Sequence, residues 1–137
     1  MKLRKTASRI LQHLGMEKSD LSIVLCDNAF IHDLNRQWRQ KDKPTDVLSF
    51  PGAAPEEIQR HRRDPDAVPL ALGDVVINLD VVHERVGDEP TSEMEEIVRL
   101  LVHGVAHLMG HDHEKTADAV RMERLEREIL SALSETV

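Results

Sequence analysis

Three histidines late in the chain have the residue type and the spacing of metal ligands. His103, His107 and His113 lie in the segment HGVAHLMGHDH, residues 103–113. The first two are four residues apart, so on a helix they lie one turn apart on the same face and can reach one metal ion. Gly110 allows the chain to turn back, since glycine adopts left-handed conformations without strain, and this turn can bring in the third histidine. Three neutral nitrogen ligands favour zinc and leave a fourth position for water.

The glycine after the first histidine separates this segment from a known zinc-protease pattern. The metzincin pattern is H-E-x-x-H-x-x-G-x-x-H, and its glutamate is the general base. Gly104 stands in that place here and can neither activate water nor protonate a leaving amine, which peptide hydrolysis requires. In the turn, His111 and Asp112 are candidates to orient a ligand imidazole, although His111 could equally be a solvated turn residue. Histidines that only hydrogen-bond within the core are the plain alternative, which suits one histidine better than three at this spacing.

The elements that position these residues follow from the spacing of apolar side chains. The segment that carries the first two histidines is apolar on nearly all sides, which is typical of a buried helix. Ser92 and Glu95 form a possible capping box at its start, and Gly110 ends it. The stretch 52–69, rich in Pro, Ala and charge, predicts a surface loop. Strands are predicted at residues 21–26, 45–50 and 72–79, and helices at residues 4–14, 28–38, 80–87, 92–109 and 116–134.

These elements predict an α+β fold in one domain, residues 1–137. A small mixed sheet of three to four strands would pack with about five helices, and the buried central helix would carry the metal-binding histidines. Asn28 is the expected cap of the second helix. In the last helix the residues expected to point inward are Ala117, Val120, Leu125, Ile129 and Leu133.

Composition and charge restrict the class of protein. The chain of 137 residues is 40% hydrophobic and 31% charged, it has no apolar run near the ~20 residues that span a bilayer, and no membrane partner is expected. The lone Cys26 excludes an intrachain disulfide and fits a reducing cytoplasm. The net charge of −7 argues against a general nucleic-acid binder. Its distribution is uneven, however, because residues 34–45 sum to +3 and residues 84–96 to −5. A local basic patch can guide a polyanion despite a negative total.

Three segments together resemble the YbeY family of bacterial metal-dependent endoribonucleases. They are HGVAHLMGHDH, LNRQWRQKDKPTDVLSFP at residues 34–51 and LGDVVIN at residues 72–78, in the family's order, within a match from about Asp20 to the end. The resemblance implies a cytoplasmic nuclease for single-stranded RNA that acts in ribosomal RNA maturation and ribosome quality control. It implies one zinc ion per chain on the three histidines, and an active-site role for Arg39. Trp38 stands where tyrosine is common, and Asp46 where asparagine also occurs.

Phosphodiester cleavage fits the absence of the protease glutamate. Charge develops on phosphate oxygens, which a metal ion and an arginine can stabilise, and the planar fork of Arg39 matches those oxygens. Without the resemblance, Arg39 would be interpreted as an exposed helix end. Lys41, Lys43 and Asp46 are further candidates for the substrate site. The aromatic residues are few, so extensive base stacking and strong sequence specificity are not expected.

Two other interpretations remain open on the sequence alone. One is a zinc peptidase or amidase on the same histidine spacing, against which Gly104 argues. The other is a metal-stabilised ribosome-assembly factor that binds without catalysis. For the nuclease itself, the expected partners beside RNA are the small ribosomal subunit and its associated proteins. An open metal position favours an enzyme over such a factor. The sequence does not distinguish water from the 2′-hydroxyl as the nucleophile, nor identify the general base.

Overall fold

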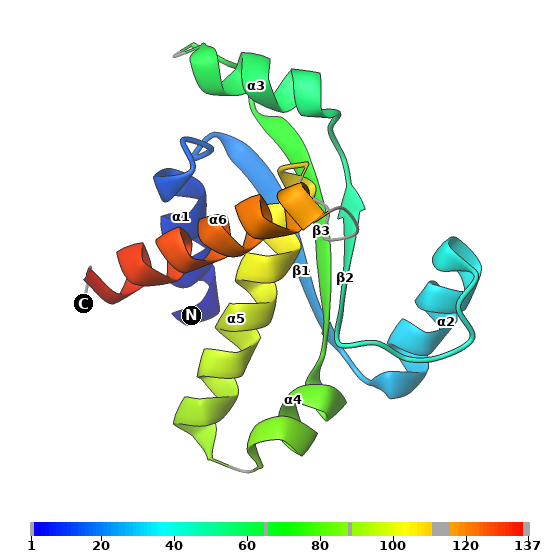
Figure 1. Cartoon of the computed structure of the whole chain (residues 1–137). Coiled ribbons are helices and arrows are strands. Elements are labelled where there is room, and N and C mark those ends of the chain that lie inside the picture. Colours follow the sequence, from blue (N-terminus) through cyan, green and yellow to red (C-terminus); the bar gives the residue numbers. More distant parts are fainter. Residues whose placement is uncertain (1, 65, 88, 111–115, 136–137) are drawn as a thin grey trace.

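A computed structural model describes residues 2–64, 66–87, 89–110 and 116–135 of the chain (Figure 1). Within these residues a three-stranded mixed sheet is packed with six helices, which confirms the predicted α+β class. None of the described helices is long and apolar enough to cross a lipid bilayer. The helices are α1 (Lys2–His13), α2 (Asn28–Arg39), α3 (Pro55–Arg63), α4 (Leu79–Val86), α5 (Pro90–Leu108) and α6 (Thr116–Glu135), and the strands are β1 (Ser19–Cys26), β2 (Val47–Pro51) and β3 (Leu70–Asn78).

The sheet has the strand order β1-β3-β2, with β3 in the centre. β1 pairs with β3 in parallel, and β2 pairs with β3 antiparallel. The central position of β3 explains its run of apolar residues, because Val75, Val76 and Ile77 are all buried and a strand covered on both faces has no polar side. The outer positions leave one side of β2 without a neighbouring strand among the described residues.

Alternate residues of the strands enter two separate hydrophobic clusters, as the two-residue period of a strand requires. Val75 and Ile77 belong to a large cluster that includes side chains of α1, α5 and α6. Val76 joins a small cluster on the opposite face, with Ile31 of α2 and Leu48 of β2. Figure 1 shows α1, α5 and α6 on one side of the sheet and α2 on the other.

The buried central helix is confirmed as α5, but its predicted start is wrong. The N-cap is Glu89, whose carboxylate accepts from the backbone N–H groups of Thr91 and Ser92, and Pro90 occupies the first turn. Proline suits that position because its missing N–H would have no helical partner there. The acceptor contacts lower the pKa of Glu89, chiefly through the backbone N–H of Ser92. The predicted capping box of Ser92 and Glu95 is therefore replaced by a cap three residues earlier.

Helix α3 corrects the prediction of a surface loop over residues 52–69. Pro55 begins the helix, Glu57 accepts a hydrogen bond from the backbone N–H of Ala54 at 3.0 Å, and Ile58 anchors the helix in the core with 1% of its surface exposed. Glutamates in the first turn and arginines in the last turn both complement the helix dipole. These local signals outweigh the turn-forming composition of the stretch.

Two further predictions need correction at the level of single residues. Asp27, not Asn28, caps α2, because its carboxylate accepts from the backbone N–H of Phe30 at 3.0 Å. In α6, Ile129 is buried as predicted, but Val120 is 47% exposed. The inward face of α6 is instead shifted, because Met122, which the spacing did not single out, is 2% exposed. Ala117 is exposed, while Leu125 and Leu133 pack against the core from partly buried positions.

Candidate active-site cleft

A cleft of about 620 Å³ lies where the C-terminal part of α5 meets β2 and the segment that follows α2. The structure brings six of the predicted site residues to this cleft, from regions far apart in the sequence. They are Arg39, Lys41, Lys43, Asp46, His103 and His107. The other three predicted residues, His111, Asp112 and His113, lie outside the described residues.

His103 and His107 are partly exposed residues in the otherwise buried C-terminal part of α5, and their rings lie next to each other. Their ring centroids are 4.8 Å apart, with an angle of 83° between the ring planes. Nδ1 of His103 pairs with Oε1 of Glu126, which reaches over from α6. If Nδ1 carries the proton in this pair, Nε2 is the acceptor nitrogen of the ring, and this is the arrangement in which a carboxylate orients a metal-binding imidazole. Glu126 was not predicted, because a contact across 23 residues leaves no local pattern.

These two imidazoles fit a transition-metal ion, which binds neutral histidine nitrogen and gains affinity from such a carboxylate partner. Within the described residues, no three His, Cys, Asp or Glu side chains come together as a complete ligand set. The predicted third ligand, His113, belongs to the part of the chain that the structure does not describe.

Gly104 is in close contact with the sheet, which explains why this position carries no side chain. A Cβ atom added there would lie 2.6 Å from Val75 Cγ1 and 3.1 Å from Ser49 Oγ. Ser49 also donates a hydrogen bond from Oγ to the carbonyl oxygen of Gly104, at 2.8 Å. The glycine thus permits α5 to approach β2 and β3 closely, and this packing leaves no room for a glutamate in the orientation that a buried helix imposes.

The segment of residues 40–46, here called the basic loop, is held at its first half by the buried Asn35. Nδ2 of Asn35 donates to the carbonyl oxygen of Lys43 at 2.8 Å, and its backbone oxygen accepts from the N–H of Lys41 at 3.2 Å. Gln40, the first residue of the basic loop, takes the left-handed conformation with φ of 54°. Oδ1 of Asn35 is the one buried side-chain polar atom among the described residues that has no hydrogen-bond partner.

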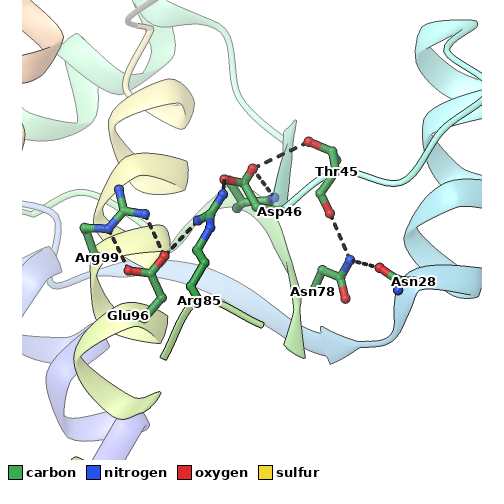
Figure 2. Close-up of polar contacts among 8 residues, drawn as sticks. Asn28, Thr45, Asp46, Asn78, Arg85, Glu96 and Arg99 are labelled. Carbon is green, nitrogen blue, oxygen red and sulfur yellow. Dashed lines mark hydrogen bonds and ion pairs between the residues drawn. The ribbon is translucent and has the colours of Figure 1, made fainter. Parts of the chain in front are cut away.

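A second buried asparagine holds the other half of the basic loop, as Figure 2 shows. Nδ2 of Asn78 donates to the carbonyl oxygen of Thr45 at 3.1 Å and to Oδ1 of Asn28 at 2.7 Å. The backbone N–H of Asn78 donates to the carbonyl oxygen of Asp46 at 2.9 Å. Buried polar groups are favourable only when they are hydrogen-bonded, so Asn78 fixes the three segments that meet at it.

Asp46 belongs to a chain of charged groups that runs from the cleft wall to α5 (Figure 2). Its Oδ2 accepts from Nη2 of Arg85 at 3.0 Å, and Nη1 of Arg85 donates to Glu96 at 2.8 Å. Arg99 donates to the same glutamate at 2.9 and 2.6 Å. The bond to Arg99, followed by that to Arg85, lowers the pKa of Glu96 against the opposing effect of burial, and the bond to Glu96 raises the pKa of Arg85. The acidic stretch 84–96 is therefore joined to the cleft through its one basic residue.

Comparison with known proteins places the chain in a family. The model of the family described as "Endoribonuclease YbeY" matches residues 1–134. Curated proteins of that name are 42% identical over 114 residues in Persephonella marina, covering 83% of this chain and 69% of the relative. They are 44% identical over 131 residues in an Anaeromyxobacter strain, covering 96% and 63%, and 42% identical over 134 residues in Acinetobacter baumannii, covering 96% and 82%.

The chain thus spans about two thirds of the length of the first relatives. The solution structure of TM1509 from Thermotoga maritima is similar in fold, with a TM-score of 0.55 and 21% identity, over 98% of this chain and 83% of that one. The family match includes all of the residues that line the cleft, from Asn35 to Gly110, and also Glu126. On this match the chain belongs to the family described as Endoribonuclease YbeY.

Proposed function

We propose that this chain is a metal-dependent endoribonuclease that cleaves single-stranded RNA. One observation carries the proposal. Two facing imidazoles and three cationic side chains, from segments sixty residues apart in the sequence, line the same cleft of about 620 Å³. The combination of an imidazole pair with a cationic wall suits a phosphodiester, whose negative charge increases during cleavage. The name shared by the relatives supports the same activity.

In this proposal one zinc ion per chain is held by His103 and His107 together with His113. The pairing of His103 with Glu126 supports the assignment, because such a carboxylate fixes the ring orientation and raises the basicity of the ligand nitrogen. When bound, the ion supplies Lewis acidity toward a phosphoryl oxygen. The burial of α5 beneath the two rings keeps their separation fixed, so little reorganisation is needed when the ion binds.

The cationic side of the cleft binds and orients the RNA backbone. Arg39 lies at the C-terminal end of α2 and lines the cleft, so its planar guanidinium can hold two phosphate oxygens at once. Lys41 and Lys43 attract neighbouring phosphates as point charges. Because Asn35 and Asn78 fix both halves of the basic loop, these cations are presented without a large loss of loop entropy on binding. His111 and Asp112 remain proposed as groups that orient a ligand imidazole.

The physiological substrate that we propose is ribosomal RNA, in its maturation and in ribosome quality control. This assignment rests on the resemblance of the three sequence segments, and it places the protein in the cytoplasm, near the small ribosomal subunit and its associated proteins. The closely packed Gly104 argues against the peptidase alternative, since the protease base would have to occupy space already filled by Val75 and Ser49.

A single preparation tests both the metal and the activity. Metal content by elemental analysis, cleavage of a mixed-sequence single-stranded RNA and cleavage of a peptide library would be measured for the wild type, with and without chelator and after zinc is added back. His107→Ala is the test variant. His13→Ala is the matched control, because His13 is an exposed histidine on α1 outside the cleft.

We expect about one zinc ion per chain in the wild type and the control, and loss of metal and RNA cleavage in His107→Ala. Full metal occupancy in that variant would contradict the ligand assignment. RNA binding without any cleavage in the zinc-loaded wild type would instead favour the non-catalytic assembly factor.

A further inference from the structure

The carboxylate of Asp46 is an anomaly in a cleft that is proposed to bind a polyanion. It lines the cleft together with Lys43 and Arg39. An uncompensated negative charge there would repel a phosphate group, and it would also draw these two cations away from the phosphate. We propose that Arg85 is a positioning residue for RNA binding, which cancels the charge of Asp46 and keeps its carboxylate turned into the protein.

The hydrogen bonds of Asp46 engage both of its carboxylate oxygens. Oδ1 accepts from the backbone N–H of Val47 at 2.8 Å and lies 3.5 Å from Oγ1 of Thr45. Oδ2 accepts from Nη2 of Arg85 at 3.0 Å. Both oxygens thus have protein donors, which hold the carboxylate in one orientation at the wall of the cleft. Its function is to connect β2 to α4, with its charge balanced in place.

The guanidinium of Arg85 is held in place by a second acid, so it stays directed at Asp46. Its other terminal nitrogen, Nη1, donates to Glu96 at 2.8 Å, and the side chain of Glu96 is only 11% exposed. Arg99 binds Glu96 from the next turn of α5, so two arginines and two acids form a group with no net charge. Removing Arg85 would leave this group with a charge of −1 and take away the hydrogen bond to Asp46, whereas removing Arg99 would make the same change of charge but take away only the bonds to Glu96.

The inference rests on the proposed cleavage of RNA and is tested by steady-state kinetics of the zinc-loaded protein. A mixed-sequence single-stranded RNA is the substrate, at two salt concentrations. The variants are Arg85→Gln, Arg85→Lys, Asp46→Asn and the double variant Asp46→Asn/Arg85→Gln. Arg99→Gln is the matched control, because Arg99 shares the partner Glu96 but is not hydrogen-bonded to Asp46. Metal content and thermal melting are recorded for each.

We expect Arg85→Gln to raise KM by about 3- to 10-fold at low salt with little change in kcat, the size of effect that one nearby surface charge produces. Raising the salt concentration should shrink the difference, since exposed charges are screened. Arg85→Lys should keep most of the affinity. The double variant should return KM close to the wild-type value even though the ion pair is absent, because it removes the carboxylate along with its partner.

Two results would overturn the inference while leaving the proposed function intact. Equal effects of Arg85→Gln and Arg99→Gln would mean that total charge, and not Asp46, sets the affinity. A double variant as weak as Arg85→Gln would mean that the ion pair acts only by supporting the fold. A wild-type protein that fails to cleave RNA under any metal condition would overturn the inference and the proposed function together.

Discussion

The two faces of the sheet are covered by cores of very different size, and each supports one half of the cleft. The histidine-bearing α5 belongs to a large cluster of buried side chains. This cluster includes residues of α1, α5 and α6, together with Val75 and Ile77 of β3. The arginine-bearing α2 rests on a cluster whose fully buried members are Ile31, Leu48 and Val76. The polar anchors Asn35 and Asn78 lie on the thinly covered side.

Under the proposed function, the two halves carry two kinds of chemistry, and this difference explains how each is held in place. A metal site requires ligands at separations held to within a fraction of an ångström, and dense packing provides this through low compressibility. A phosphate-binding loop must remain accessible to a large substrate and cannot be buried. Hydrogen bonds from buried asparagines to its backbone therefore replace the missing apolar support.

The largest expected effect is on the rate of RNA cleavage, and it tests whether the two halves of the cleft act independently. Arg39→Ala should lower kcat for RNA cleavage by about 10²–10³-fold, the typical loss when one charge-stabilising donor is removed. Zinc content and melting temperature should not change, because Arg39 is exposed at the end of α2. Arg39→Lys should recover only part of the rate, since an ammonium group cannot bind two oxygens in a fork.

The control for this prediction is Arg36→Ala on the same helix, where the arginine pairs with Asp33 and is not part of the cleft. Loss of zinc together with activity in Arg39→Ala would show that the two halves are not separable in this way.

The next effect concerns the dense half. Gly104→Ala should destabilise the protein by about 1–3 kcal/mol, as overpacking of a core typically does, although alanine in a helix interior is ordinarily about 1 kcal/mol better than glycine. The cause is the added Cβ, which would lie 2.6 Å from Val75 Cγ1. Urea unfolding measures the change.

Val75→Ala in the same chain provides the internal check. The double variant should be more stable than the sum of the two single effects, because the second change removes the clashing methyl groups. A neutral or stabilising Gly104→Ala would show that α5 can shift away from the sheet, and that the dense half is softer than its packing indicates.

Native-state hydrogen exchange compares the two halves directly. Backbone amides in the middle of α2 should exchange about tenfold or more faster than those in the middle of α5, since local opening is easier where fewer apolar contacts must be broken. The region around Asn35 should be the slowest part of α2, because its side chain ties the helix to the basic loop. Equal protection in α2 and α5 would mean that the asparagine contacts fully compensate for the small core.

The smallest effect is chemical and uses the one cysteine. Cys26 lies beside the small cluster, and its thiol pKa is raised to about 11 by burial and then by the charges of Asp27 and Asp80. Because the thiolate is the reactive form, alkylation of the native protein should be slow at pH 8 and should accelerate about tenfold per pH unit towards pH 10. In urea the pKa falls towards its usual value and the reaction at pH 8 should be faster. Mass spectrometry of iodoacetamide labelling follows both rates, and identical rates in the two states would contradict the raised pKa.

The most deeply buried elements were the easiest to predict from the sequence. The apolar circumference of α5 and the continuous apolar run of β3 can both be recognised in the sequence alone, and both elements are observed as buried. Helix α3 was missed because a single buried residue, Ile58, gives no repeating pattern. Its signals were Pro55 in the first turn and the charges at both ends, which are weak beside the turn-forming residues around them. Likewise, Val120 fits the helical repeat, but contacts of α6 with α1 and α5 set which face points inward.

The site divides along the same lines. The histidine pair could be predicted because both residues lie on one helix face, four residues apart. Arg39 and the basic loop meet the histidines because β2 returns antiparallel beside β3. No sequence spacing encodes this return, so the active-site role of Arg39 could be predicted only from a family resemblance. The contacts of Glu126 with His103 and of Arg85 with Asp46 span 23 and 39 residues, so neither leaves a local signal.

The outer side of β2 has a consequence for the behaviour of the protein at high concentration. Asp46 and Gly52 bond to β3 through their backbones, so by the alternation of an antiparallel ladder the backbone groups of Val47, Ser49 and Pro51 point away from β3. The first of these N–H groups is already bonded to the Asp46 carboxylate, and proline has none. A strand edge with so few donors is a poor template for another strand, which protects the molecule against edge-to-edge aggregation at the place where its cleft must stay open.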